Sequence, residues 1–270
     1  MIKFKSILAL GLVSFFSMNA MAVDEKLTVT GSSTIAPLAL EMAKAYEKKN
    51  PGVRIDVQSG GSSRGISDAR KGLAEIGMVS RALTEEEKDL KGFPVAMDGV
   101  TLILNKKNTV TTLTNEQIIA IFTGKITNWK EVGGKDAAIT VVNKAEGRST
   151  LEVFLNYFKI KNSEIKASVV VAENEQGIKT VAGNPNSIGY VSIGTAEYDS
   201  KNGVAIKLLP MLGIAANTEN VKNGQFPMSR VLNLVTKTEP TGLQKKFIDF
   251  ALSKEAADLI KKEYFVPITK

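Results

Sequence analysis

Residues 30–37 read TGSSTIAP and join a short β-branched run, Leu27–Thr30, to an amphipathic segment. The run is typical of a strand. Apolar residues then recur at helical spacing from Ile35 to Tyr46, which predicts a helix with one buried face. The stretch is therefore interpreted as a strand, a tight Gly-Ser turn and the start of a helix.

This turn has the chemistry of an anion site. Ser33 or Thr34 is expected to cap the helix, and Pro37 suits a first turn, where its missing N–H has no helical partner. Free N–H groups, hydroxyls and the positive end of the helix dipole would then face the same way. Taken alone, such a turn is better explained as a capped helix without a ligand, by roughly two to one.

The same pattern recurs along the chain. A strand at Val53–Val57 leads into QSGGSSRGI at 58–66, and a strand at Ile139–Asn143 leads into KAEGRST at 144–150. A third strand, 75–79, ends in Ser and Arg. Four segments thus share hydroxyl and guanidinium donors: Ser32-Ser33-Thr34, Ser62-Ser63, Ser80-Arg81 and Arg148-Ser149-Thr150.

Strands alternate with helices throughout, which predicts an α/β fold with mostly parallel sheets. The run Gly99–Leu104 is almost wholly apolar and is expected to form a buried strand. In such sheets ligands lie beyond the carboxyl ends of the strands, where the Gly-Ser turns fall. We therefore expect the four segments to build one site for a tetrahedral oxyanion.

The first 22 residues resemble a signal peptide. Lys3 and Lys5 precede an apolar run, and residues 20–22 read AMA, so cleavage is expected after Ala22. The chain has no Cys, which predicts a protein held together by its core and without lipid attachment. We expect it to be periplasmic.

The chain has no His, which excludes His metal sites, Ser-His-Asp triads and imidazole acid–base chemistry. Its net charge of +7 is spread in pairs such as Lys48-Lys49 and Lys106-Lys107. These pairs are interpreted as solvated surface, so no nucleic-acid partner and no cofactor are predicted. A monomer is expected.

Five further stretches carry a resemblance: GSSTIAP at 31–37, GGSSRG at 60–65, IGMVSR at 76–81, IFTGKITNW at 121–129 and IGYV at 188–191. In this order they resemble the phosphate-binding subunit of the ABC phosphate importer. The resemblance implies a two-lobed type II periplasmic binding protein that clamps phosphate in its cleft and passes it to a membrane permease. The lobes are expected at 23–104 with 206–270, and at 105–205.

The resemblance also implies which residues hold the phosphate. The predicted ligands are Ser33, Thr34, Ser62, Ser80, Arg81, Arg148, Ser149 and Thr150. Members of the family often carry an aspartate where this chain has Ser80, so rejection of sulfate is open. The family's arginine before the second-lobe turn is Lys144 here, and we predict that Arg148 provides the guanidinium instead.

Three other functions are alternatives to phosphate transport. A binding protein for another oxyanion, such as sulfate, molybdate or a phosphonate, would use the same donors. An adhesive or signalling protein could keep this fold. A phosphate-ester hydrolase would need metal ligands or a base, and Asp56, Asp68 and Asp98 show no ligand spacing. We therefore predict that the chain is not an enzyme.

Overall fold

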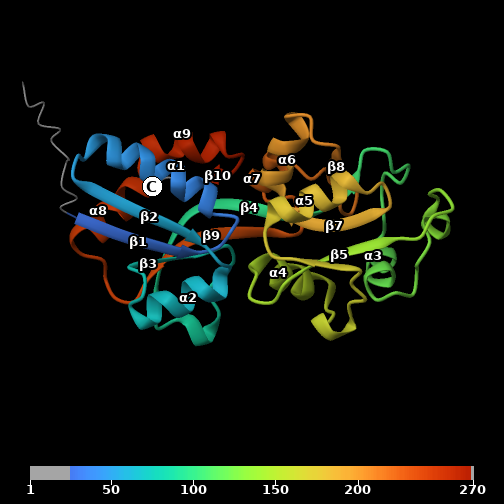
Figure 1. The fold of residues 1–270 in the computed structure, drawn as a ribbon, viewed down its shortest axis with the longest axis horizontal. Coiled ribbons are helices and arrows are strands. Elements are labelled where there is room, and N and C mark those ends of the chain that lie inside the picture. The colour runs from blue at the N-terminus through green and yellow to red at the C-terminus, as the bar shows by residue number, and fades with distance from the viewer. Residues whose placement is uncertain (1–24, 269–270) are drawn as a thin grey trace, which may run out of the picture.

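The computed structural model describes residues 25–268. One long mixed sheet runs through the molecule, with helices on both of its faces (Figure 1). The strand order is β2-β1-β3-β9-β4-β7-β5-β6, with β8 and β10 pairing on β4. The predicted α/β class is confirmed.

The first lobe is the left half in Figure 1. Its strands are β1 (Glu25–Gly31), β2 (Val53–Ser59), β3 (Ile76–Val79), β9 (Ser229–Thr236) and β10 (Val266–Pro267). Its helices are α1 (Ala36–Lys49), α2 (Ser62–Lys71), α8 (Gly242–Ala251) and α9 (Lys254–Lys262), with a 3-10 turn η1 (Glu85–Glu87). Residues of α1, α8 and α9 share one hydrophobic core with β1, β2, β3 and β9.

The second lobe is the right half in Figure 1. Its strands are β5 (Thr140–Lys144), β6 (Val169–Val171), β7 (Ser187–Ser192) and β8 (Ile206–Leu208). Its helices are α3 (Asn115–Phe122), α4 (Ser149–Phe158), α5 (Asn174–Gly183), α6 (Ile193–Lys201) and α7 (Thr218–Lys222), with 3-10 turns η2 (Trp129–Val132) and η3 (Asn162–Glu164). Its main core includes Phe122, Phe154 and Tyr190, and Phe154 stacks on Tyr190.

Strand β4 (Lys91–Asn105) belongs to both lobes. Its first part, to Gly99, pairs with β9, whereas its last part, from Val100, pairs with β7 and β8. The outer pairs in each lobe are parallel, as predicted, but the central ladders of β4 and β9 are antiparallel. The predicted lobe boundaries remain a prediction, although Leu209, Val221 and Met228 pack in the second core.

The amphipathic helix α1 forms as predicted. Leu38, Met42 and Tyr46 are buried on its inner face. Its expected caps are wrong, however, because Ile35 holds the N-cap position and neither Ser33 nor Thr34 caps it. The Ser32 hydroxyl instead accepts the backbone N–H groups of Thr34 and Ile35 at 3.2 and 3.4 Å.

Helix α2 lies very close to the sheet because Gly65 of the helix faces Gly77 of β3. Its N-cap is Gly61, with a φ of 94°, and no side chain caps it. A Cβ added to Gly65 would lie 2.8 Å from the carbonyl oxygen of Met78 and 2.9 Å from that of Thr30. This approach fixes the start of α2 against the ends of β1 and β3.

Candidate functional site

A small polar cavity lies where the two lobes meet. Ten residues line it: Ser32, Ser33, Thr34, Gly61, Ser62, Ser80, Arg148, Ser149, Thr150 and Ala172. The structure therefore brings together all four segments singled out from the sequence. Seven of the eight predicted ligands line the cavity, and Arg81 is the exception.

Three helices begin at this cavity: α1, α2 and α4. The first N–H groups of a helix have no intrahelical partner, and the helix dipole places partial positive charge there. Ser62 and Ser149 are the first residues of α2 and α4. Two lobes thus direct helix N-termini at one small space, which suits an anion.

The cavity hydroxyls are held mainly as acceptors of protein hydrogen bonds. The Thr34 hydroxyl accepts from Asn174 Nδ2 at 3.1 Å, across the lobes. The Ser62 hydroxyl accepts from the backbone N–H of Ser80 at 3.2 Å. Since each oxygen is fixed by a protein donor, the hydroxyl hydrogens remain available to an anion.

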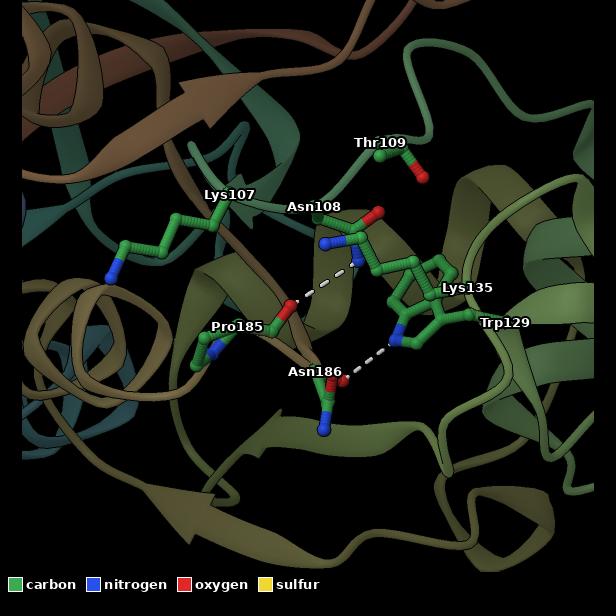
Figure 2. Close-up of a pocket in the computed structure, with 7 residues that line it drawn as sticks. All are labelled: Lys107, Asn108, Thr109, Trp129, Lys135, Pro185 and Asn186. Atoms are coloured by element: carbon green, nitrogen blue, oxygen red, sulfur yellow. Dashed lines mark hydrogen bonds between the residues drawn. The ribbon is translucent and has the colours of Figure 1, made fainter.

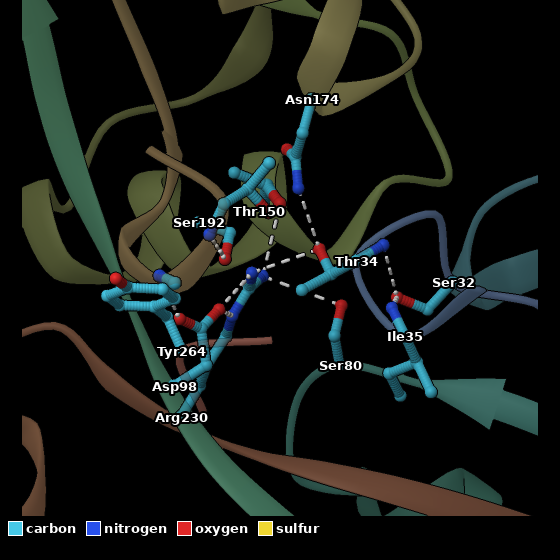
Figure 3. Close-up of polar contacts among 12 residues, drawn as sticks. Ser32, Thr34, Ile35, Ser80, Asp98, Thr150, Asn174, Ser192, Arg230 and Tyr264 are labelled. Carbon is cyan, nitrogen blue, oxygen red and sulfur yellow. Dashed lines mark hydrogen bonds and ion pairs between the residues drawn. The ribbon is translucent and has the colours of Figure 1, made fainter. Parts of the chain in front are cut away.

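Arg230 on β9 is the main finding that the sequence did not predict. Its guanidinium donates to Asp98 Oδ2 at 2.7 and 3.0 Å, to Thr34 at 3.1 Å and to Thr150 at 3.1 Å (Figure 3). Its Nη1 also lies 3.5 Å from the Ser80 hydroxyl. One buried guanidinium thus organises three cavity hydroxyls that come from both lobes.

Asp98 supports Arg230 from the neighbouring strand. The two residues face each other directly in the β4–β9 ladder, and their side chains are each 1% exposed. The other Asp98 oxygen accepts the backbone N–H of Gly194 at 3.1 Å. A buried ion pair with its remaining atoms satisfied is rigid, and removing one partner leaves an uncompensated charge. Each charge stands beside an apolar strand segment, but this local pattern does not show that the two residues pair.

Arg148 lines the cavity, and its predicted contact with phosphate stays a prediction. Its Nη1 donates to Glu173 Oε1 at 2.8 Å, so its charge is partly balanced within the second lobe. Lys144 lies behind this pair and donates to the Glu173 carbonyl oxygen at 2.8 Å. Lys144 is only 2% exposed, and burial lowers its pKa to about 7. It is therefore not a surface charge, and it does not line the cavity.

Arg81 turns away from the cavity, contrary to the prediction. Its guanidinium forms a bidentate pair with Glu87 at 2.6 and 2.9 Å and a further ion pair with Glu152 of α4. The hydrogen bonds from Arg81 hold the pKa of Glu87 below its ordinary value. Two carboxylates that the sequence analysis did not consider thus compete for this arginine. The Arg81–Glu152 pair joins the two lobes.

A second cavity, of about 150 Å³, lies elsewhere in the second lobe. Lys107, Trp129 and Lys135 line part of it (Figure 2). Its Trp129 Nε1 donates to the Asn186 carbonyl oxygen at 2.9 Å, and Asn108 donates to that of Pro185 at 3.3 Å. These two hydrogen bonds connect the loops that carry Trp129 and Asn108 to the backbone at residues 185–186, so both side-chain donors already have protein partners. The pocket shares no residue with the cavity between the lobes.

Residues 25–268 offer neither a metal site built from acidic side chains nor a membrane-spanning helix. No group of three or more His, Cys, Asp or Glu side chains there could hold a metal ion. Within the same range, every helix is too short or too polar to cross a bilayer. The predicted signal peptide and its cleavage site lie outside the described residues.

Comparison with known proteins agrees with this architecture. A family model described as the PBP superfamily domain matches residues 19–255. This chain belongs to the PBP superfamily. The phosphate-binding protein PstS of Bacillus subtilis (strain 168) is 32% identical over 248 residues, which cover 90% of this chain and 81% of that protein.

Solved structures of PBP-type proteins are similar along most of the chain. One is a putative phosphate ABC transporter substrate-binding protein from Clostridium perfringens, with bound phosphate. It is 38% identical, with a TM-score of 0.84 over 90% of this chain and all of that one. An ABC-type phosphate transport receptor from Vibrio cholerae is 30% identical, with a TM-score of 0.73 and the same coverage. The expected type II fold is confirmed.

Proposed function

We propose that this protein binds inorganic phosphate and delivers it to the permease of an ABC importer. The observation that carries the proposal is the cavity between the lobes, where helix N-termini and buried hydroxyls form a donor-rich site beside Arg148. Such donors stabilise an oxyanion through charge-assisted hydrogen bonds. The names of the relatives in Bacillus, Clostridium and Vibrio support phosphate as the anion.

The site is suited to binding rather than catalysis. Its ten lining residues include hydroxyls but neither a carboxylate nor any other side chain that could serve as a general base. The single arginine among them donates hydrogen bonds and accepts none. We therefore propose a solute-binding protein and not an enzyme, exported after cleavage at Ala22 and monomeric.

The lobes meet in a way that supports capture by closure. Thr34 bonds to Asn174, Arg230 bonds to Thr150, and the Ser63 N–H donates to the Gly147 carbonyl oxygen at 3.3 Å. Each of these contacts joins the first lobe to the second. We propose that phosphate entry and release require their separation.

The hinge of this motion is proposed where strand pairing changes lobes. In β4 the partner changes between Gly99 and Val100, and the returning chain enters β9 at Ser229. These positions differ from the boundaries near Asn105 and Ile206 that the sequence suggested. The difference arises because residues 206–228 pack on the second core before the chain crosses back.

Calorimetric titration tests this function. The protein is unfolded and refolded to remove bound anion, then titrated separately with phosphate, sulfate, molybdate and a phosphonate. We expect micromolar or tighter phosphate binding, equivalent to about −8 kcal/mol or better. Tighter binding of sulfate, molybdate or a phosphonate would assign the site to another oxyanion. Binding of none of these anions would contradict the transport function and favour an adhesive or signalling role.

A further inference from the structure

The Ser149 hydroxyl differs from its neighbours in the cavity. Ser149 is 1% exposed, and its Oγ has no hydrogen-bond partner. Within residues 25–268, two other buried side-chain atoms share this property, Thr30 Oγ1 and Ser187 Oγ, and neither residue lines the cavity. A buried hydroxyl without a partner is unfavourable, so this oxygen is poised for a group that the protein does not provide.

Two cavity hydroxyls already accept as many hydrogen bonds as an oxygen can. Ser32 Oγ accepts two backbone N–H groups, at 3.2 and 3.4 Å. Thr34 Oγ1 accepts from Asn174 and from Arg230, each at 3.1 Å. A hydroxyl oxygen has two lone pairs, so these two side chains can only donate to a bound anion.

Three further hydroxyls accept one protein hydrogen bond each. Ser62 accepts from a backbone N–H at 3.2 Å, and Thr150 accepts from Arg230 at 3.1 Å. Ser80 lies 3.5 Å from the same guanidinium. Thr150 and Ser80 each already face the positively charged guanidinium of Arg230. This charge disfavours a second donor, such as a phosphate O–H, at either hydroxyl. Among the buried hydroxyls of the cavity, Ser149 is the one whose two lone pairs are both uncommitted. The Ser33 hydroxyl also lines the cavity, but Ser33 is only half-buried, so water can reach its oxygen.

Phosphate and sulfate differ in what they require of such a site. Hydrogenphosphate carries one O–H group, which must donate to an acceptor when it is buried, whereas the sulfate dianion carries no proton. We propose that Ser149 Oγ accepts the O–H of bound hydrogenphosphate and thereby helps the site to distinguish phosphate from anions without a proton. The proposal rests on the phosphate-binding function proposed above.

Ser80 is less suited to this role than Ser149. Arg230 Nη1 already directs a proton toward the Ser80 hydroxyl from 3.5 Å. No carboxylate lines the cavity among residues 25–268. A serine hydroxyl can also rotate and donate, so it rejects a proton-free anion less strongly than a carboxylate would. We therefore expect discrimination of about tenfold rather than several thousandfold.

Monofluorophosphate is a sharp probe, because it is a dianion of similar shape in which fluorine replaces the hydroxyl. Competition against radiolabelled phosphate at pH 8 gives the dissociation constants of phosphate and fluorophosphate for each variant. In the wild type, we expect phosphate to bind about tenfold more tightly, and in Ser149→Ala we expect this ratio to approach one. Ser62→Ala is the matched control: it removes a donor, so both anions should weaken together and the ratio should persist.

The outcomes separate the two proposals. Equal weakening of both anions by Ser149→Ala would make Ser149 a donor and overturn the inference, as would a ratio that does not change. If the wild-type protein binds neither anion, the proposed function itself fails. Thermal melting of each variant confirms that it is folded before its affinities are compared.

Discussion

Arg230 shows how one side chain can set the polarity of a whole site. Its guanidinium spans Asp98, Thr34 and Thr150, which a flat fork with five donors can do and a single ammonium cannot. We expect Arg230→Lys to weaken phosphate binding by at least tenfold while keeping the positive charge. Calorimetry measures the change.

The matched control is Arg64→Lys, since Arg64 is exposed and pairs with Asp68 within α2. That variant should bind phosphate as the wild type does. Affinity within twofold of wild type in Arg230→Lys would show that charge alone matters and that the hydrogen-bond geometry does not.

Lys144 gives the stability a distinct dependence on pH. Its pKa falls from 10.5 to about 7 in the folded protein because it is buried. Between these values the unfolded chain binds a proton that the folded chain does not, so the free energy of unfolding rises with pH. In urea titrations from pH 7 to pH 9, Lys144→Met should lose about 2 kcal/mol of this increase. Below pH 7 the two profiles should run parallel.

The exposed Lys125 provides the control for this measurement. Lys125→Met should retain the full rise in stability above pH 7. If Lys144→Met kept that rise as well, the pH dependence would have to come from another group.

At the level of elements, the sequence predicted which turns line the cavity. It did not predict how far the central strands extend or with which strands they pair. Strand β4 was predicted only over Gly99–Leu104, because Pro94 and Asp98 interrupt its apolar pattern. The ladder shifts register between Pro94 and Ala96, which accommodates the proline. Asp98 is accommodated by Arg230 across the ladder. Both solutions depend on a partner strand about 130 residues away, which no local pattern reveals.

Because local patterns do not reveal distant partners, some cavity residues could be predicted from the sequence and others could not. Ser33, Thr34, Ser62 and residues 148–150 line the cavity. Their positions could be predicted because Gly-Ser turns at strand ends have a local signature. Arg81 was misplaced because its partners, Glu87 and Glu152, compete with the cavity for it. Arg230 and Asp98 were missed because each is explained only by the other.

For the whole molecule, closure depends on contacts that exist only when the lobes meet. The Arg81–Glu152 ion pair is one of them, with side chains 12% and 29% exposed. Glu152→Gln should weaken phosphate binding by about fivefold, roughly 1 kcal/mol for a partly buried pair, mainly through faster release. Stopped-flow displacement measures the release rate, and small-angle scattering of the anion-free protein measures how open it is.

Asp68→Asn is the control for this prediction, because the Arg64–Asp68 pair lies within one helix. It should change neither the release rate nor the scattering profile. A wild-type release rate in Glu152→Gln would show that the pair forms without holding the lobes together.

Trp129, the single tryptophan, has a spectroscopic consequence. Its indole is 2% exposed, packs in the core of the second lobe and is bonded to Asn186 just before β7. Emission excited at 295 nm therefore reports the unfolding of the second lobe. The first lobe carries Tyr46 against Phe247 and Phe250 instead. Comparing the fluorescence transition with the far-ultraviolet circular dichroism transition thus tells an experimenter whether the two lobes melt as one cooperative unit.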